Sequence, residues 1–283
     1  MKKLMFAAVA ALAFTAFAEE ATSEAEDTCN IPVWGFANYG LSSGYKLYGS
    51  LVNSEPTLQG YAEINCNLPL GYAGVGVWSN SDLTDKRRSS LRRAFNEFDF
   101  NVHWGNDFWF NDDKTYGIFY LTDVVWYYYP QTGRQGRPNT TQDWNHYFEF
   151  KNPFVNPFVK WVHEYHNGGD LIDFGAKKTI AVCDKLSITP QADFFWRSSS
   201  YRWCFPGFGY TTAGHRAGRG LASMDLGVTA NYQLTDHFGL FAKVSYCQIL
   251  DQGLRETAER ATGSTYGKYE QFAWGQVGVS CNF

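Results

Sequence analysis

The sequence lacks any apolar run long enough to cross a membrane as a helix. A spanning helix needs roughly 18 apolar residues, and the chain beyond residue 18 contains no such stretch. A helical period of 3.6 residues is also missing from this part of the chain. The six cysteines follow no metal-binding spacing, so no zinc motif is predicted. These absences argue against a helical membrane protein and leave β-structure as the expectation.

The first residues have the pattern of an export signal. Met1-Lys2-Lys3 is basic, Leu4 to Phe17 is apolar, and small residues surround Ala18. This pattern predicts a cleaved signal peptide over residues 1–18 and is too short for a membrane anchor. No lipid-attachment cysteine follows it. Removing Lys2 and Lys3 takes the formal charge from -4 to -6. Residues 19–30 are predicted to be an acidic, flexible periplasmic leader.

The remaining chain, 31–283, alternates between polar and apolar residues. It belongs to a sequence that is 18% aromatic, contains 27 glycines and has a mean hydropathy of -0.35. Such a composition suits a barrel with one lipid face and one polar lumen. We predict an all-β fold, a transmembrane antiparallel up-and-down β-barrel of about 12 strands. The strands are expected near 31–41, 54–66, 71–80, 94–105, 115–128, 143–151, 153–166, 170–182, 185–197, 220–233, 237–248 and 268–283.

The predicted links between these strands alternate in length. Short turns, such as Asn67–Leu70, alternate with longer loops at 42–53, 81–93, 129–142, 198–219 and 249–267. The exception is the brief link after the seventh strand, His166 to Asp170. Short turns on one side and long loops on the other are typical of bacterial outer-membrane barrels. Aromatic residues gather at strand ends, as they do at lipid–water boundaries. A soluble secreted β-sandwich fits the composition but has no reason to alternate its links in this way.

The chain ends in an alternating segment, Val277 to Phe283, that closes on an aromatic residue. This segment resembles the closing strand of outer-membrane barrels, in which a C-terminal Phe is part of the signal read by the barrel-assembly machinery. The resemblance implies that Phe283 is an assembly signal and that the protein resides in a bacterial outer membrane.

The first half of the mature chain resembles the TorF-type family of outer-membrane porins. The similarity rests on Gly40 to Gly49, Glu55-Pro56-Thr57-Leu58-Gln59-Gly60, and the Gly-rich segment Gly71 to Asn80. Glu97-Phe98-Asp99 and Tyr127-Tyr128-Tyr129-Pro130 match later landmarks. Leu47-Tyr48-Gly49 departs from the family's Arg-Gly pattern. The resemblance implies a barrel and a channel, and it implies no catalytic residue.

Polar residues with a period of two are expected to face the lumen. The lumen and selectivity candidates are Glu63, Glu97, Asp99, Asn101, His103, Glu149, Lys177, Asp193, Asp225, Lys243 and Glu270. One interpretation is a narrow aqueous pore that favours cations, because acidic rings attract them. The alternative is a packed network that plugs the lumen, since twelve strands lie between a filled and an open barrel.

The predicted loops carry basic residues and one candidate disulfide. Lys86, Arg87, Arg88, Arg92 and Arg93 would form an electropositive extracellular mouth that attracts anions or lipopolysaccharide phosphates, or they are simply solvated loop charges. Cys204 and Cys247 map to the outer end and could form a disulfide, which an exported protein permits. A nucleic-acid partner is not expected for an acidic chain in this compartment.

We therefore expect an outer-membrane porin-like channel for passive diffusion of small hydrophilic solutes or ions. Its expected partners are outer-membrane lipid, lipopolysaccharide and the assembly machinery; neither a cofactor nor a metal is predicted. A closed structural or adhesive barrel is the main alternative. An outer-membrane hydrolase is a third hypothesis, since His166 could meet Ser198–Ser200 at the rim; no catalytic residue is assigned, and the preferred interpretation is not an enzyme.

Overall fold

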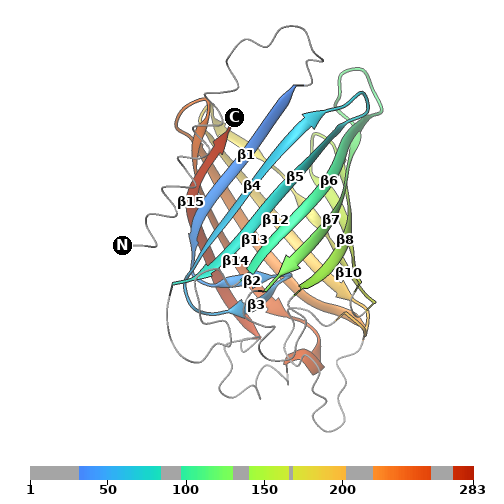
Figure 1. Ribbon diagram of the computed structural model, residues 1–283, viewed down its shortest axis with the longest axis vertical. Helices are drawn as coiled ribbons and strands as arrows, with labels where there is room; N and C mark the ends of the chain where they lie inside the picture. The colour runs from blue at the N-terminus through green and yellow to red at the C-terminus, as the bar shows by residue number, and fades with distance from the viewer. Residues whose placement is uncertain (1–31, 84–96, 130–139, 166–167, 202–218, 256–269) are drawn as a thin grey trace.

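The chain forms a closed antiparallel β-barrel (Figure 1). The computed structural model describes residues 32–83, 97–129, 140–165, 168–201, 219–255 and 270–283. Each wall strand is hydrogen-bonded to its neighbour in sequence, and two further pairings close the ring: β1 with β15, and β10 with β12. Closure thereby pairs each position of the described wall with a neighbour on both sides, which is the arrangement that β-structure needs in lipid.

Twelve strand positions make up the wall. The wall strands are β1 (Val33–Ser42), β4 (Thr57–Asn67), β5 (Tyr72–Asp82), β6 (Glu97–Trp109), β7 (Gly117–Tyr128), β8 (Thr140–Lys151), β9 (Asn156–Glu164), β10 (Gly169–Lys177) with β11 (Ile180–Cys183), β12 (Leu186–Arg197), β13 (Gly220–Gln233), β14 (Phe238–Ile249) and β15 (Gln271–Asn282). β10 and β11 share one position because both pair with β12.

The predicted fold class and strand number are confirmed. Every predicted strand overlaps an observed wall strand, and the largest differences lie at strand ends. The predicted strand 170–182 is interrupted at Lys178 and Thr179, where β10 ends and β11 begins. Within the described residues, no helix is both long and apolar enough to cross a membrane.

The two faces of the wall differ in chemistry. In β6, Phe100 and Val102 are each 52% exposed, whereas Glu97 and His103 are 3% and 5% exposed. The same alternation places large apolar side chains on the outside of the other strands, including Ile64, Val228, Val244, Val277 and Val279. The outer face is therefore an apolar belt and the inner face is polar, as a barrel in lipid requires.

The barrel has two unlike ends. We call the end with Leu68–Gly71, Asn152–Val155 and Leu234–His237 the turn end, because only short links join strands there. The opposite end, which carries the longer segments, is the loop end. The C-terminus lies at the turn end, where Gly35 N donates to Phe283 O over 2.7 Å and Phe283 N donates to Gly35 O over 3.1 Å.

The first predicted loop, 42–53, is not a simple loop. It contains a two-stranded hairpin of β2 (Tyr45–Leu47) and β3 (Ser50–Asn53) that pairs with no wall strand. All four residues of β3 are buried. Figure 1 shows β2 and β3 lying across the loop end of the barrel. We refer to residues 44–53 as the inner hairpin.

Candidate functional site: the lumen and its inner hairpin

The inner hairpin is closed by a two-residue turn, Tyr48-Gly49. Leu47 pairs with Ser50, and the two turn residues have φ values of 49° and 68°. Positive φ at both central positions defines a type I′ turn, which matches the twist of a hairpin. A tyrosine in this conformation costs of the order of 1–2 kcal/mol. Contacts of Tyr48 with the wall offset that cost.

Those contacts show that the hairpin crosses the whole lumen. The ring of Tyr45 lies 5.4 Å from that of Trp78 on β5, and the ring of Tyr48 lies 5.9 Å from that of Phe195 on β12. In the ring of twelve positions, β5 and β12 are six apart. They therefore stand on opposite sides of the barrel, and one short hairpin touches both.

A third side of the wall holds the hairpin by polar contacts. Lys46 Nζ forms an ion pair with Asp225 on β13 and donates to Ser245 Oγ on β14 over 2.9 Å. The same amine lies 4.5 Å from the centroid of the Trp274 ring on β15. Trp274 Nε1 in turn donates to Gly44 O over 2.8 Å. These bonds tie the start of the hairpin to three adjacent wall strands.

Carboxylates meet the hairpin on the side of β6. Burial, and after it the charge of Glu97, raise the pKa of Tyr45 well above its ordinary value. Its phenol therefore stays protonated and donates a hydrogen bond to Glu97. Asn53 Nδ2 donates to Asp82 Oδ1 over 2.6 Å, which ties the last hairpin residue to β5.

An apolar cluster fills the lumen around the hairpin at the loop end. Its buried members come from the hairpin, five wall strands and the segments that follow β12 and β14: Tyr45, Val52, Val162, Leu171, Phe195, Tyr201, Ala222, Ile249 and Leu254. Leu254 belongs to the single helical turn after Asp251. Most of this cluster lines the inside of a barrel, where an open channel would be polar. Apolar side chains consequently obstruct the lumen here.

Beyond the hairpin, one side of the lumen is acidic. The wall from β4 to β7 presents inward the carboxylates Glu63, Asp82, Glu97, Asp99, Asp107 and Asp123. Among the described residues, neither Asp99 nor Asp123 forms an ion pair. One carboxylate oxygen of each is buried without a hydrogen-bond partner. Glu63 accepts from Tyr61 Oη over 2.6 Å, and His103 Nε2 lies 2.6 Å from Asn65 Oδ1.

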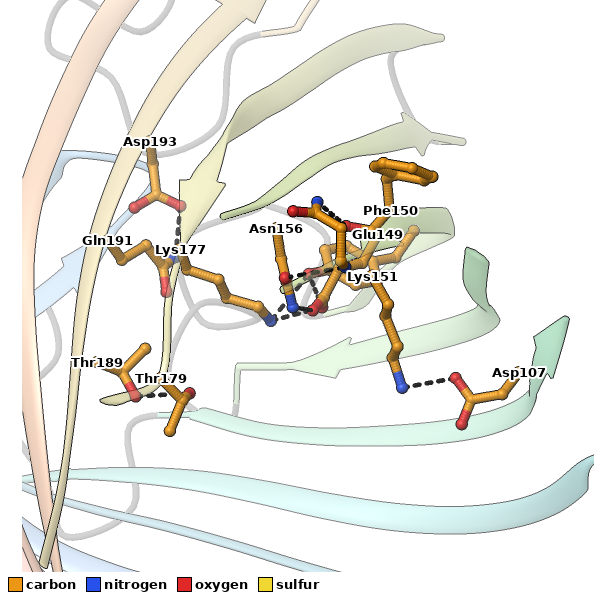
Figure 2. A network of polar contacts seen from close by, with 12 residues as sticks. Asp107, Glu149, Phe150, Lys151, Asn156, Lys177, Thr179, Thr189, Gln191 and Asp193 are labelled. Carbon is orange, nitrogen blue, oxygen red and sulfur yellow. Dashed lines mark hydrogen bonds and ion pairs between the residues drawn. The ribbon is translucent and has the colours of Figure 1, made fainter. Parts of the chain in front are cut away.

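The other side of the lumen carries the amines. Lys160, Lys177 and Lys243 lie on β9, β10 and β14, facing inward among Asp173, Asp193 and Asp225. Figure 2 shows Lys177 reaching across to Glu149 of β8, with Nζ and Oε2 2.7 Å apart. Lys243 stacks over Phe241 at 5.5 Å. Acidic and mixed walls thus face each other across the lumen.

The structure places the predicted lumen residues as follows. Glu63, Glu97, Asp99, Asn101, His103, Glu149, Lys177, Asp193, Asp225 and Lys243 all lie on wall strands in the inward register. Glu270 directly precedes β15 and shares the parity of the inward Trp274. Hydrogen bonds join Asn101 to His103 at 2.9 Å, and the ion pair joins Glu149 to Lys177. The proposed role of these residues in selectivity stays a prediction.

Several residues of the site were missed by sequence reasoning. Lys46, the hairpin's anchor, was assigned to an outer loop, although Tyr48-Gly49 between short apolar runs is a hairpin signal. Asp143 and Tyr147 share the inward face of β8 with Glu149. Arg197 was not among the predicted lumen residues. It ends β12 with 4% exposure and donates to Tyr201 O over 2.8 Å.

Other predicted groups are only partly described. Lys86, Arg87, Arg88, Arg92 and Arg93 lie outside the described residues. Cys204 does too, so the Cys204–Cys247 bond stays a prediction. Cys247 is a buried free thiol in this structure.

The hydrolase hypothesis gains no support at the rim. His166 lies outside the described residues. Ser198 Oγ accepts from Asp170 N over 2.8 Å and lies 3.2 Å from Ser200 Oγ. Ser200 Oγ donates to Gly168 O over 3.1 Å. The visible contacts of both serines are therefore with backbone and with each other.

Comparisons with known proteins find likenesses of fold only. No family model matches the chain, and no curated protein matches its sequence. Among solved structures, a NanC porin is similar with a TM-score of 0.49, 9% identity, and coverage of 87% of this chain and 98% of that one. A KdgM porin in complex with disordered oligogalacturonate is similar with a TM-score of 0.47 and 8% identity, over 88% of this chain and 99% of that one. Outer membrane phospholipase A from Escherichia coli is similar with a TM-score of 0.44 and 12% identity, over 88% of this chain and 92% of that one.

These neighbours include both porins and an enzyme. The class that the fold and the lumen define is a twelve-stranded antiparallel barrel with an apolar outer belt and a charged interior. The resemblance to TorF-type porins stays a prediction.

Proposed function

We propose that the protein is a bacterial outer-membrane channel for small hydrophilic solutes or ions, regulated in width by the inner hairpin. The observation that carries this proposal is the contrast between the two faces of the wall. An apolar belt of exposed side chains surrounds the barrel, while carboxylates and amines line its inside. A charged lumen has no packing advantage over an apolar one, because burying charges is costly. It suits water and ions.

The mechanism is diffusion filtered by size and charge. Solutes would pass the inner hairpin and then the acidic wall, where Asp99 and Asp123 face the lumen without an ion-pair partner among the described residues. Such carboxylates attract cations and repel anions. We expect a cation-favouring channel of low conductance. The orientation proposed here places the turn end in the periplasm and the loop end, with the arginine-rich 86–93 segment, at lipopolysaccharide.

A planar-bilayer recording under a salt gradient tests the proposal. The refolded wild-type protein should give discrete current steps with a cation-selective reversal potential. Barrel insertion is verified by the shift in gel mobility on heating. A correctly folded barrel that never conducts would refute the channel.

A closed barrel is the second candidate, because a specific observation favours it. The apolar cluster and the hairpin contacts span the lumen at the loop end. This version predicts no conductance in the wild type and a binding role for the loops. Liposome swelling distinguishes the two: small neutral sugars enter liposomes that hold the channel and are excluded by the closed barrel.

A further inference from the structure

The turn end holds a pocket that neither the hairpin nor the acidic wall explains. It has a volume of about 400 Å³ and is lined by residues of three neighbouring turns and strand ends. Four of its lining residues are lysines: Lys114, Lys151, Lys177 and Lys178. Volumes of several hundred Å³ are typical of small-molecule sites.

Two of the four amines are neutralised within the protein. Lys151 Nζ lies 2.6 Å from Asp107 Oδ1, and Lys177 Nζ lies 2.7 Å from Glu149 Oε2. Figure 2 shows both pairs side by side, with Asn156 also directed at Glu149. These ion pairs hold the two lysine side chains in place and already compensate their positive charges.

The other two amines lack a carboxylate. No ion pair joins Lys114 or Lys178 to any described carboxylate. Lys178 Nζ donates instead to the backbone carbonyls of Asn152 and Pro153. Asp112 and Asp113 share the exposed turn with Lys114, and Asp113 Oδ1 accepts from the backbone N of Thr115 over 3.2 Å, but neither aspartate lines the pocket or pairs with Lys114. Two amines of the pocket lining are therefore without an ion-pair partner among the described residues.

The pocket opens inside the barrel. Trp109, Lys151 and Lys177 occupy inward register positions on β6, β8 and β10. A ligand would reach them from the aqueous lumen and not from the lipid. Trp109 offers a flat aromatic surface, already used by Lys151, whose amine lies 5.4 Å from the ring centroid.

We propose that this pocket binds a small soluble dianion, such as a phosphorylated or doubly carboxylated solute, at the turn end of the lumen. Two amines without ion-pair partners can meet two negative charges, and ammonium groups bind phosphate or carboxylate as point charges. Only the physiological meaning of this site rests on the proposed channel, because binding is measurable whether or not the lumen conducts. It would hold an anion at one end of an otherwise acidic passage.

Calorimetric titration of the refolded full-length protein with inorganic pyrophosphate, which carries at least two negative charges at neutral pH, tests this site. The double variant Lys114→Gln/Lys178→Gln removes both amines that lack an ion-pair partner and orphans no carboxylate. We expect saturable binding to the wild type and about tenfold weaker binding to the double variant, which corresponds to about 1.4 kcal/mol. Sucrose, a neutral solute of comparable size, should not bind.

The matched control is Lys185→Gln. Lys185 is exposed on the neighbouring turn between β11 and β12 and does not line the pocket. Its loss should change pyrophosphate affinity less than twofold. Absence of saturable wild-type binding would overturn the proposal, and so would an equal loss in the Lys185→Gln variant, since that would show diffuse attraction. A silent bilayer with intact pyrophosphate binding would refute the channel and leave the site standing.

Discussion

At the scale of single residues, the ion pair of Lys46 with Asp225 holds the inner hairpin against the wall. Both side chains are largely withdrawn from water, with exposures of 17% and 10%. Removing the carboxylate partner of such an amine costs more free energy than breaking an exposed ion pair, because the amine stays partly desolvated. Ser245 and the Trp274 ring hold the same amine only by weaker contacts.

Asp225→Asn should loosen the hairpin without changing side-chain size. Losing the charge partner weakens the anchor by about 1–3 kcal/mol. We expect open events in single-channel records to become about tenfold more frequent. Asp236→Asn, in the exposed turn between β13 and β14, is the control and should behave as the wild type. Unchanged opening in Asp225→Asn would show that the pair does not restrain the hairpin.

Gly49 tests the packing of the hairpin turn. Gly49 and Gly168 have nearly equal φ values, 68° and 67°, so alanine meets similar backbone strain at both. A Cβ at Gly49 would lie 3.0 Å from Ser223 Oγ and 3.1 Å from Phe195, whereas at Gly168 it would meet nothing within 4 Å.

Gly168→Ala should therefore lower the free energy of unfolding by about 1 kcal/mol. Gly49→Ala should lower it by about 1 kcal/mol more, because the turn must also move from the wall. Urea unfolding in detergent, followed by tryptophan fluorescence, measures both. Equal losses would mean that the turn of the inner hairpin does not press against β12 and β13.

At the scale of elements, the pairing of β1 with β15 closes the ring. The ring of Phe283 lies over Gly35: a Cβ at Gly35 would come within 2.3 Å of its Cε2 atom. The final residue thus packs on the first strand as well as bonding to its backbone. This contact gives the predicted assembly role of Phe283 a structural counterpart in the closed barrel.

Phe283→Ala should reduce the yield of closed barrel more than the loss of a comparable aromatic elsewhere. The matched control is Phe238→Ala, an exposed phenylalanine on β14 that faces lipid at the same end. The fraction of heat-modifiable protein after refolding into vesicles is the measurement. We expect severalfold less folded Phe283→Ala than Phe238→Ala, and equal yields would contradict the closing role.

The wall strands could be predicted from sequence because each carries its own signal. In the segment from Glu97 to Trp104, apolar residues at even numbers alternate with polar residues at odd numbers. This period of two assigns both faces of the strand without knowledge of its neighbours. The inner hairpin could not be assigned in this way. Its residues Leu51 and Val52 are both buried because the hairpin is surrounded, so they show no alternation.

Pairings across the lumen were also beyond sequence reasoning. Lys46 and Asp225 are 179 residues apart, and only ring closure brings them together. The face of each lumen residue follows from its strand, whereas its partner depends on the shear of the barrel and on what enters it. Arg197 illustrates the limit, since a charged residue at a strand end is usually solvated, yet Arg197 is 4% exposed.

At the scale of the whole molecule, the protein combines a closed barrel with an obstruction inside it. The wall is a closed ring with a charged interior, and the inner hairpin bridges β5 and β12 across it. We propose that this hairpin sets the width of the passage. Because it pairs with no wall strand, its removal should leave the ring of twelve positions intact.

The most direct measurement compares single-channel currents of the wild type with those of a variant in which residues 45–52 are replaced by a short Gly-Ser linker. Both must show the heat-dependent gel shift of a folded barrel. We predict severalfold larger steps in the variant, with retained cation selectivity from the acidic wall. Equal currents, or silence in both folded proteins, would contradict the account, because the hairpin would then not control the passage.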